Sequence, residues 1–402
     1  MLEDSLPKRS IEAICALQDA DGGLLATPLD DAYPFVYPRD ASFMAMALNM
    51  HGLYDRSKSF FSFLSKVRRP NGEVYQRYNK GYPFVSQEGE ADVTPIVIQG
   101  IYDTYAASND LSFLERSWEM VARGAAFVLS NINGQSGLVH TMRSIHETRI
   151  LEEGFELWAN CASVKGLLDA SRAASALGRE EVAETWLAHG KALWDRAQER
   201  LFDPDKGLFI KNLRKDGARV TAPDVSLLAP FYFGLSNDGT TLRRTIRHLK
   251  KTLWNEEVGG LNRFRDFEIV DDWHWYTGGT EASWPLFTLW LARLCRRAGD
   301  PDTADECLDF VMRSANQDGD LPEKVAPMRG YTEWKDHETG YNERVINGVA
   351  KAEKSSTSIP GYIPWACPLG WSHAEYLMLD RKDNSPEERD LLESASQVSK
   401  GQ

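Results

Sequence analysis

The chain of 402 residues carries its apolar residues mostly at spacings of three and four, and strict alternation of apolar and polar residues is rare. Spacings of three and four place apolar side chains on one face of a helix, whereas strands alternate with a period of two. The pattern therefore predicts an all-α fold. The twelve predicted helices cover residues 8–19, 40–52, 55–68, 91–107, 110–132, 160–177, 179–200, 223–235, 239–254, 280–297, 301–315 and 371–380.

Short turns join many of these segments in pairs. The clearest pair is 160–177 with 179–200, which meet at Gly178, and a second pair meets at Gly299-Asp300-Pro301. Glycine and proline are typical of helix ends, and short connections favour antiparallel neighbours. The twelve segments are therefore interpreted as six helical hairpins. Between them lie long loops rich in aromatic residues, at 20–39, 69–90, 136–159, 255–279 and 317–370. Loops of that length are usually functional.

Composition narrows the class of partner. The net charge of −13 argues against nucleic acid or an anionic membrane surface as partner. No run of 18 apolar residues exists that could span a bilayer, and the first residues lack the apolar centre of a secretory signal, so we expect a cytoplasmic protein. The five cysteines show no CxxC spacing and are expected to be reduced. Twelve tryptophans exceed the needs of a core and fit a carbohydrate site.

The sequence predicts no metal ion and no cofactor. His274 and His373 lack neighbours at the spacing of metal ligands, and no HExxH motif occurs. Neither GxGxxG nor GxxxxGK[ST] is present, so no nucleotide is implied.

The most informative stretch is Tyr33-Pro-Phe-Val-Tyr37-Pro-Arg39-Asp40. Its prolines and aromatic residues predict a stiff loop, and Asp40 stands where the N-cap of the next helix is expected. An arginine supplies planar donors, a carboxylate accepts, and aromatic rings can face the apolar side of a sugar. The stretch therefore favours a ligand with many hydroxyl groups.

Three further motifs lie on either side of this stretch, one before it and two near the end of the chain. Asp21-Gly-Gly-Leu-Leu-Ala-Thr-Pro28 precedes the aromatic loop, and Leu321-Pro-Glu323 and Pro368-Leu-Gly-Trp371-Ser-His-Ala374 come near the end. Together they resemble glycoside hydrolase family 15, the glucoamylase family of inverting α-glucosidases. The resemblance runs from about Asp21 to Leu379.

The resemblance implies an (α/α)6 barrel, in which an outer ring of helices surrounds an inner ring and the long loops form a pocket at one end. We expect residues 1–380 to form a single catalytic domain. The charged, serine-rich segment 381–402 is expected to be a disordered tail.

Inverting hydrolysis requires two carboxyl groups, a general acid that protonates the leaving oxygen and a general base that activates water. Glu323 matches the position of the family's base, although Lys324 replaces the usual glutamine. The family's acid follows an Asp-Leu-Trp triplet, which here reads Glu156-Leu-Trp158 and continues with Ala159, a residue without an acidic proton.

The acid is therefore predicted to lie elsewhere in the same loop. Glu156 is favoured because its apolar neighbours would raise the pKa of its carboxyl, as a general acid requires. Glu153 is the second choice, and Glu152 is also available. Loss of the acid is the remaining possibility.

The resemblance also implies a set of substrate-binding residues. Arg39 and Asp40 would hold hydroxyls of the terminal sugar, Tyr33 would lie near the water and the base, and Tyr37 would stack on the ring. Asp92 matches a polar family position but also suits an N-cap. The remaining expected contacts are Trp158, Arg263 with Arg265 as a rival, Trp275 or Trp273, and Trp371, which is expected to buttress the pocket together with His373 behind it.

These residues predict an inverting, exo-acting α-glucosidase that releases β-glucose from the non-reducing end of a small oligosaccharide. Isomaltose and isomaltooligosaccharides are favoured, with maltose or trehalose as further candidates, and the oligomeric state is left open. Ala159 motivates an alternative, a sugar-binding protein without hydrolytic activity on the same barrel. A phosphorylase is a lesser option, because no basic anion pocket is evident in the sequence.

Overall fold

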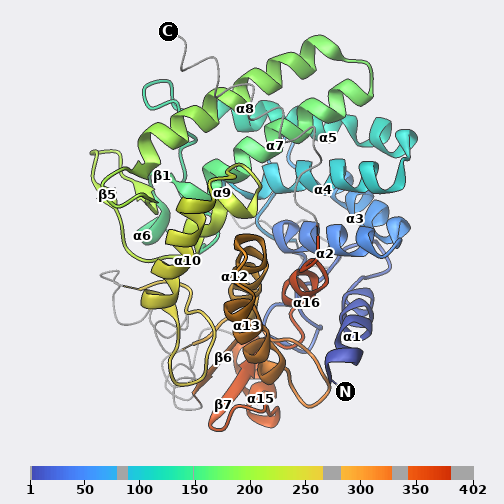
Figure 1. Cartoon of the computed structure of the whole chain (residues 1–402). Helices are drawn as coiled ribbons and strands as arrows, with labels where there is room; N and C mark the ends of the chain where they lie inside the picture. The colour runs from blue at the N-terminus through green and yellow to red at the C-terminus, as the bar shows by residue number, and fades with distance from the viewer. Residues whose placement is uncertain (1, 79–88, 148, 266–281, 328–342, 382–402) are drawn as a thin grey trace.

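The computed structural model of the chain describes residues 2–78, 89–147, 149–265, 282–327 and 343–381 (Figure 1). Most of these residues are helical. The long helices are α1 (Leu2–Ala16), α2 (Pro38–Met50), α3 (Tyr54–Val67), α4 (Val93–Ser108), α5 (Leu111–Ser130), α7 (Leu157–Ala176), α8 (Glu180–Leu201), α10 (Gly239–Leu253), α12 (Pro285–Ala298), α13 (Pro301–Ser314), α15 (Glu343–Lys354) and α16 (Gly370–Leu377). The short ones are α6 (Arg149–Glu152), the 3-10 turn η1 (Val225–Leu228) and α9 (Ala229–Tyr232).

Six helices form a closed inner ring within the described part of the chain. Helix α2 packs on α4, α4 on α7, α7 on α9, α9 on α12, α12 on α16, and α16 returns to α2. A second helix covers most of these from outside: α1 packs on α16, α3 on α2, α5 on α4, α8 on α7, and α10 and α13 on α12. The chain thus alternates between an outer and an inner helix, as the six predicted hairpins require.

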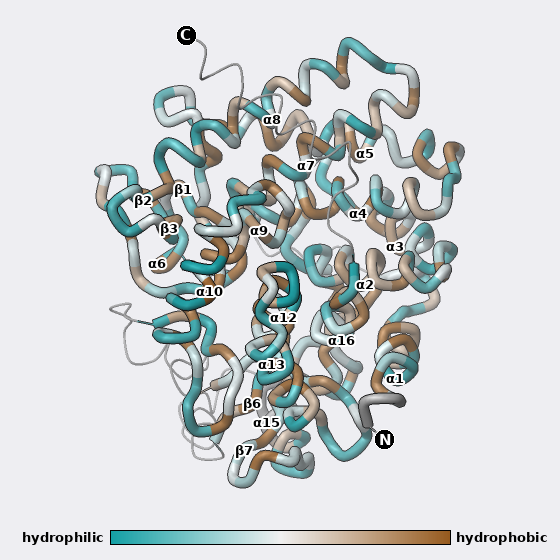
Figure 2. The backbone as a smooth tube through the Cα atoms, in the orientation of Figure 1, coloured by the Kyte–Doolittle hydropathy of each residue, from teal (hydrophilic) through white to brown (hydrophobic). Residues whose placement is uncertain are grey.

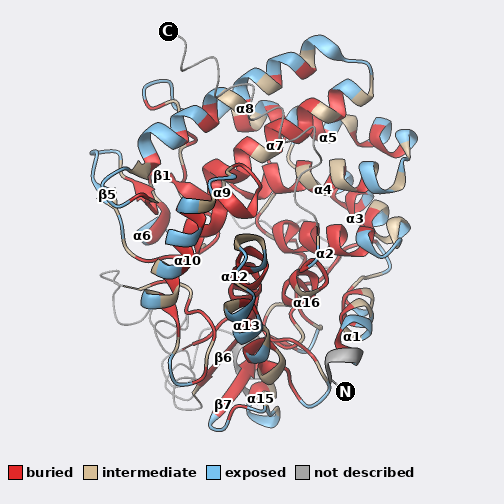
Figure 3. Cartoon of the chain, in the orientation of Figure 1, coloured by how far each residue is buried: buried red, intermediate tan, exposed pale blue. Residues whose placement is uncertain are grey.

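Burial follows this division. Nearly every residue of α2, α7, α12 and α16 is buried, whereas α8 and α10 each keep an exposed polar face (Figure 3). Figure 2 shows the same division as hydropathy, with hydrophilic residues along the outward side of α10. An inner helix has to be apolar on almost all sides, while an outer helix needs only one apolar stripe.

Aromatic rings fill the centre of the ring of helices. Trp158 of α7 stacks on Trp290 of α12 with ring centroids 4.7 Å apart, and Phe43 of α2 stacks on Trp371 of α16 at 5.0 Å. Tyr232 of α9 contacts both Trp158 and Trp290. Rings of this size bury much apolar surface, so they form a solid floor beneath the loops.

Helices α4 and α7 pack so closely that one of them needs a glycine at the contact. A Cβ atom added to Gly166 of α7 would lie 2.6 Å from Cβ of Pro95 in α4. Glycine therefore permits the contact between these two inner helices.

Short strands within the loops form three small antiparallel sheets. Strand β1 (Phe155–Glu156) pairs with β4 (Asn212–Leu213), which pairs with β5 (Arg219–Val220), and β2 (Phe202–Asp203) pairs with β3 (Leu208–Phe209). Strand β6 (Lys324–Pro327) pairs antiparallel with β7 (Tyr362–Trp365), with Lys324 opposite Trp365.

Three predictions about local structure were wrong. Helix α7 begins at Leu157 rather than 160, because the Glu156 side chain caps it by accepting hydrogen bonds from the N–H groups of Trp158 and Ala159. The predicted helix 223–235 is a 3-10 turn followed by the short α9, and the predicted loop 317–370 contains β6, α15 and β7. The assignment of 1–380 to one domain stays a prediction, and most of the predicted tail, 382–402, lies outside the described residues.

Candidate active site

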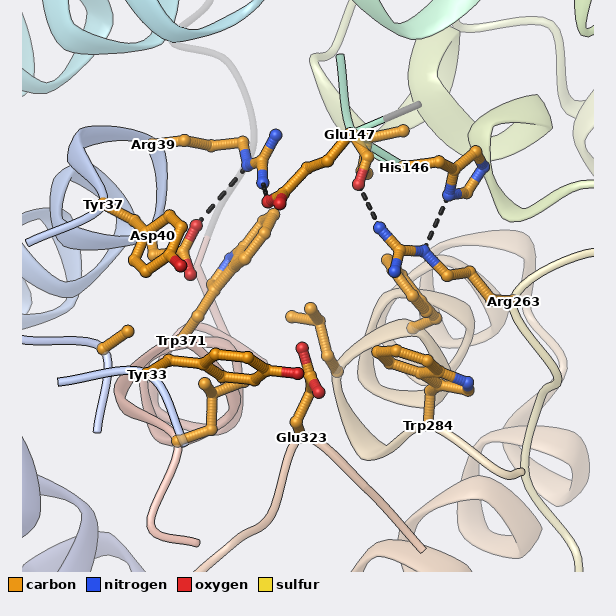
Figure 4. Close-up of a pocket in the computed structure, with 15 residues that line it drawn as sticks. Tyr33, Tyr37, Arg39, Asp40, His146, Glu147, Arg263, Trp284, Glu323 and Trp371 are labelled. Carbon is orange, nitrogen blue, oxygen red and sulfur yellow. Dashed lines mark hydrogen bonds and ion pairs between the residues drawn. The ribbon is translucent and has the colours of Figure 1, made fainter. Parts of the chain in front are cut away.

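A pocket opens at the end of the barrel where the inner helices α2, α12 and α16 begin (Figure 4). Four of the five predicted loops, those at 20–39, 136–159, 255–279 and 317–370, contribute to it. Its polar lining consists of Tyr33, Tyr37, Arg39, Asp40, His146, Glu147, Arg263 and Glu323; its apolar lining consists of Ala26, Ile145, Trp284, Leu286, Phe287, Leu369 and Trp371.

Glu323 points into this pocket beside the hydroxyl end of Tyr33 (Figure 4). Its Oε2 atom is buried and has no hydrogen-bond partner among the described residues. Burial raises the pKa of Glu323, while the positive charges of Lys324 and Arg263 lower it and Glu147 adds a smaller increase. An unpaired carboxylate oxygen facing a cavity is a site for a ligand or a water molecule.

The turn that carries Glu323 is anchored by the Trp371-Ser-His motif. The Leu321 N–H donates to Nε2 of His373 at 3.0 Å, and the Ser372 hydroxyl donates to the Pro322 carbonyl at 2.8 Å. Because Nε2 accepts, Nδ1 carries the proton and faces the Ser10 hydroxyl at 2.9 Å. Burial lowers the pKa of His373 to about 3, so the ring stays neutral. His373 thus supports the site from behind, as the sequence predicts.

Arg39 and Asp40 lie side by side in the first turn of α2. The sequence places Asp40 at the N-cap, but Tyr37 occupies that position, and Asp40 follows within the helix. Arg39 Nε and Asp40 Oδ1 are 3.4 Å apart, and neither atom has a hydrogen-bond partner among the described residues. Burial raises the pKa of Asp40 to about 7, although Arg39 opposes the shift. A donor and an acceptor in this state suit two sugar hydroxyls.

Further carboxylates hold the other side of the Arg39 guanidinium. Nη1 lies 3.1 Å from Glu90 and 3.3 Å from Asp92, and Nη2 lies 2.8 Å from Glu147. The guanidinium also lies over the ring of Trp371, 5.5 Å from its centroid. These contacts fix Arg39 in one orientation at the pocket wall.

Glu147 enters the pocket opposite Glu323 (Figure 4). It belongs to the turn between Thr141 and α6 and has a backbone φ of 60°. A residue other than glycine seldom adopts a positive φ, and such strain is concentrated at functional sites. Sequence reasoning missed Glu147 because the family motif directs attention to the residues beside Trp158; its signal was a Glu-His pair in one of the long loops.

The three glutamates predicted as candidates for the acid do not line the pocket. Glu156 has no exposed side-chain surface and accepts hydrogen bonds from the Trp158 and Ala159 N–H groups, the Ser144 hydroxyl and the Lys211 ammonium. Burial raises its pKa, as predicted, but no substrate atom can reach a carboxylate filled by four protein donors.

Glu152 and Glu153 are excluded from the pocket for different reasons. Glu152 is buried and accepts hydrogen bonds from the N–H groups of Ser144 and His146, and it shares the single proton of the Ser144 hydroxyl with Glu156. Glu153 is partly exposed and pairs with Arg149 at 3.1 Å. Glu152 and Glu156 therefore hold the turn that presents Glu147, instead of acting on substrate themselves.

Two predicted substrate contacts lie beneath the pocket. Trp158 is fully buried against Trp290 and donates its indole N–H to Asp92 at 2.8 Å. Asp92 occupies the N-cap position of α4 without capping it, and is also fully buried. Neither residue lines the pocket, so both support Arg39 and the barrel floor instead of contacting substrate.

Of the other predicted substrate contacts, some line the pocket and some do not. Tyr33, Tyr37, Arg263 and Trp371 line the pocket together with Trp284, whereas Arg265 does not. Trp273 and Trp275 lie outside the described residues. In the parts of the chain that the structure describes, no cluster of three or more histidine, cysteine or acidic residues could hold a metal ion, and no helix has the length and apolar character that a bilayer crossing requires.

Comparisons with known proteins agree with this architecture. Residues 144–342, which include Glu147 and Glu323, match the family model of the mannosylglycerate hydrolase MGH1-like glycoside hydrolase domain. A curated relative, an "Uncharacterized glycosyl hydrolase" of Methanocaldococcus jannaschii, is 24% identical over 300 residues, which cover 73% of this chain and 45% of that protein. The chain thus spans about half the length of this relative.

Solved structures share the fold along nearly the whole chain. A structure named "Glycosidase Wild Type" aligns with 93% of this chain and 95% of its own at a TM-score of 0.69 and 20% identity. A bacterial glucoamylase complexed with acarbose aligns with 98% of this chain and 57% of its own at a TM-score of 0.68 and 18% identity. A mannosylglycerate hydrolase of Thermus thermophilus, of glycoside hydrolase family 63, aligns with 94% of this chain and 100% of its own at a TM-score of 0.61 and 12% identity.

The comparisons confirm the predicted all-α (α/α)6 barrel and support the predicted class of glycoside hydrolase. The names of these structures span more than one glycosidase family, so what they share with this chain is the barrel fold.

Proposed function

We propose that this chain is an inverting, exo-acting α-glucosidase that releases β-glucose from the non-reducing end of short α-glucosides. The observation that carries the proposal is the pair of carboxyl groups, Glu147 and Glu323, which enter one pocket from opposite sides (Figure 4). A carboxyl pair across a sugar site is the minimum requirement for acid–base glycoside hydrolysis.

Glu323 is proposed as the general base. Its unpaired Oε2 can accept a proton from water, and the Tyr33 side chain beside it can help to orient that water. The positive charges of Lys324 and Arg263 favour its ionised form against burial.

Glu147 is proposed as the general acid in place of Glu156. In the free pocket it is paired with Arg39. A sugar hydroxyl that takes over this arginine donor would free the Glu147 side chain to face the glycosidic oxygen. Proton donation would thereby depend on a correctly bound sugar.

Arg39, Asp40 and Arg263 are proposed to bind hydroxyls of the terminal glucose, with Tyr37, Trp284 and Trp371 against its apolar faces. Stacking of this kind agrees with the polar and aromatic lining of the pocket. A glycosidase structure of the same fold contains glucose, which supports a glucose-sized site in this chain as well.

Isomaltose is the favoured substrate by resemblance to family 15, with maltose and trehalose as candidates. Purified protein would be incubated with each sugar and with mannosylglycerate, and the released sugar and its anomer would be followed by NMR. We expect β-glucose as the first product of an α-glucoside. The α-anomer would contradict inversion, and release of mannose from mannosylglycerate alone would contradict an α-glucosidase.

The alternative is a sugar-binding protein without hydrolytic activity. The observation in its favour is the Arg39–Glu147 ion pair, which already engages the side chain of the proposed acid. Binding of glucose without turnover of any of these substrates would favour this second function.

A further inference from the structure

We propose that His146 and Asp224 are positioning residues that hold Arg263, and through it the turn that carries Glu147, in the geometry the sugar site needs. The proposal rests on the proposed function only in assigning Arg263 and Glu147 to substrate. It concerns the row formed by the buried Asp224 and His146 and the partly buried Arg263, of which only Arg263 has a proposed contact with the sugar.

Three contacts in series define the row. Asp224 Oδ2 lies 2.7 Å from His146 Nε2, and His146 Nδ1 lies 2.7 Å from Arg263 Nε. Arg263 Nη2 then donates to the carbonyl of Ile145, two residues before Glu147. Arg263 therefore connects the pocket wall to the turn that carries Glu147. Figure 4 shows its contact with His146.

The chemistry of the donors fixes the state of the imidazole. Arginine only donates, so His146 Nδ1 must accept, and the ring proton must be on Nε2. Nε2 then donates to Asp224, which also accepts from the Ser226 N–H at 2.8 Å and lies 3.6 Å from the Lys211 ammonium. A neutral imidazole with one defined tautomer is the only form compatible with all of these contacts.

The charges around His146 agree with that form. Burial and the positive charges of Lys211 and Arg263 lower the pKa of His146 to about 4, while Asp224 opposes the shift. Glu152 accepts from its backbone N–H, and the ring of Phe264 lies 5.3 Å away edge to face. Protonation of Nδ1 would remove the acceptor for Arg263, so the row requires neutral histidine.

Burial distinguishes positioning from direct catalysis. His146 borders the pocket, but its side chain and that of Asp224 have no exposed surface, and both ring nitrogens of His146 already have protein partners, so neither residue offers a group to a sugar. Arg263 lies over the ring of Trp284, 4.9 Å from its centroid, and faces the pocket. The effect of His146 on substrate would therefore be transmitted through Arg263.

Nitrogen-15 NMR of the histidine side chains tests the row without any substrate. The signal of His146 is identified by its loss in His146→Asn. We expect the Nε2–H tautomer in the wild-type protein, and a changed tautomer population in Asp224→Asn, whose amide can donate to Nε2. A wild-type His146 that is protonated on Nδ1 would overturn the proposal whether or not the protein hydrolyses α-glucosides.

Kinetics on isomaltose test the consequence. His146→Leu removes the acceptor and should lower kcat/KM about tenfold or more, a typical coupling within one hydrogen-bond network. His146→Asn places an amide oxygen near the position of Nδ1 and should recover most of the loss. In an Arg263→Ala background, His146→Leu should have little further effect, because the residue through which it acts is gone.

Two kinetic outcomes would contradict the positioning role. The first is full additivity of His146→Leu and Arg263→Ala, and the second is equal loss in His146→Leu and His146→Asn with matching losses of thermal stability. If no sugar is hydrolysed, the proposed function fails, while the tautomer of His146 still decides the positioning proposal.

Discussion

Glu156 and Glu323 are both buried or partly buried glutamates at the pocket end of the barrel, yet their surroundings are opposite. Four protein donors fill the carboxylate of Glu156, whereas an oxygen of Glu323 faces the pocket without a partner among the described residues. A saturated carboxylate stabilises structure, and an unsaturated one is available for chemistry. The number of donors around a carboxylate therefore separates the two roles better than the sequence position does.

The same difference separates two regions of the molecule. The cluster of Glu152, Glu156, Lys211 and Asp224 is fully buried, and its carboxyl groups are held by the Lys211 ammonium and by backbone N–H groups. The pocket instead keeps atoms of Arg39, Asp40 and Glu323 that form no hydrogen bond with any described residue. The charges of the buried cluster fix a turn, whereas those of the pocket are available for a ligand. Substitutions in the two regions should therefore have different effects on activity and stability.

The largest effect is expected from the two pocket carboxyls. Glu147→Gln and Glu323→Gln should each lower kcat on isomaltose by about 10²–10⁴, the usual contribution of a general acid or base. Thermal stability should change little, because Arg39 keeps its pairs with Glu90 and Asp92 when it loses the partly exposed Glu147, and Glu323 Oε2 has no hydrogen bond to lose among the described residues. Glu153→Gln is the matched control, because Glu153 lies in the same loop region outside the pocket, and its kcat should equal that of the wild type. A fully active Glu147→Gln enzyme would remove Glu147 from the mechanism.

Glu156→Gln should act on stability instead of chemistry. It leaves the Lys211 ammonium without its nearest carboxylate, and breaking a buried pair costs about 3–5 kcal/mol. Urea unfolding should show that loss, while the folded fraction keeps its kcat within a few-fold.

The double variant Glu156→Leu with Lys211→Met is the companion experiment. Replacing both charges by apolar groups should recover part of the lost free energy of unfolding. If Glu156→Gln abolished turnover while the urea midpoint stayed unchanged, Glu156 would be the general acid. The distinction between a structural Glu156 and a catalytic Glu323 would then be wrong.

The buried cluster should also make the protein sensitive to acid through His146. Its pKa is about 4 in the folded protein and about 6.5 when unfolded, so the unfolded chain binds the proton first as the pH falls. Stability from this group is complete above pH 6.5 and is lost as the pH falls through 4, by up to about 3 kcal/mol. The free energy of unfolding should fall less steeply over this range in His146→Asn than in the wild type. Equal slopes would show that His146 already carries its proton in the folded state.

The smallest effect is expected at the support of Glu323. Ser372→Ala removes one hydrogen bond to the Pro322 carbonyl and should lower the free energy of unfolding by about 1 kcal/mol. His373 and the β6–β7 pairing still hold the turn, so kcat should fall only a few-fold. A loss as large as that of Glu323→Gln would mean that the turn depends on this single contact.

Most helices of the barrel could be predicted from the sequence, because helix periodicity and turn residues are local signals, whereas the closure of the barrel was implied only by the family resemblance. Eleven of the twelve predicted segments overlap a long helix that the structure describes. The exception, 223–235, contains Pro230 in the first turn of α9, and the segment bends there instead of continuing as one helix. Helix α15 and strands β6 and β7 were missed, since a β-pair depends on contacts between segments far apart in the chain.

The site could be predicted where the residues themselves carry chemistry. Arg39, Asp40, Tyr33, Tyr37, Arg263, Glu323 and Trp371 all line the pocket, as the motifs indicate. Glu156, Trp158 and Asp92 do not, because sequence motifs give order along the chain but not the direction of a side chain. Glu147 could not be chosen over its neighbours, since its exposure depends on a left-handed turn held by Glu152.

A crystal structure of Glu147→Gln with isomaltose or glucose in the pocket would test the central claim most directly. The account predicts that the anomeric carbon lies between residue 147 and Glu323, with their side-chain carbonyl groups roughly 6.5–9.5 Å apart and room for one water beside Glu323. Arg39, Asp40 and Arg263 should contact the sugar hydroxyls. A sugar bound beside Glu156, or one that leaves either residue 147 or Glu323 out of contact, would contradict it.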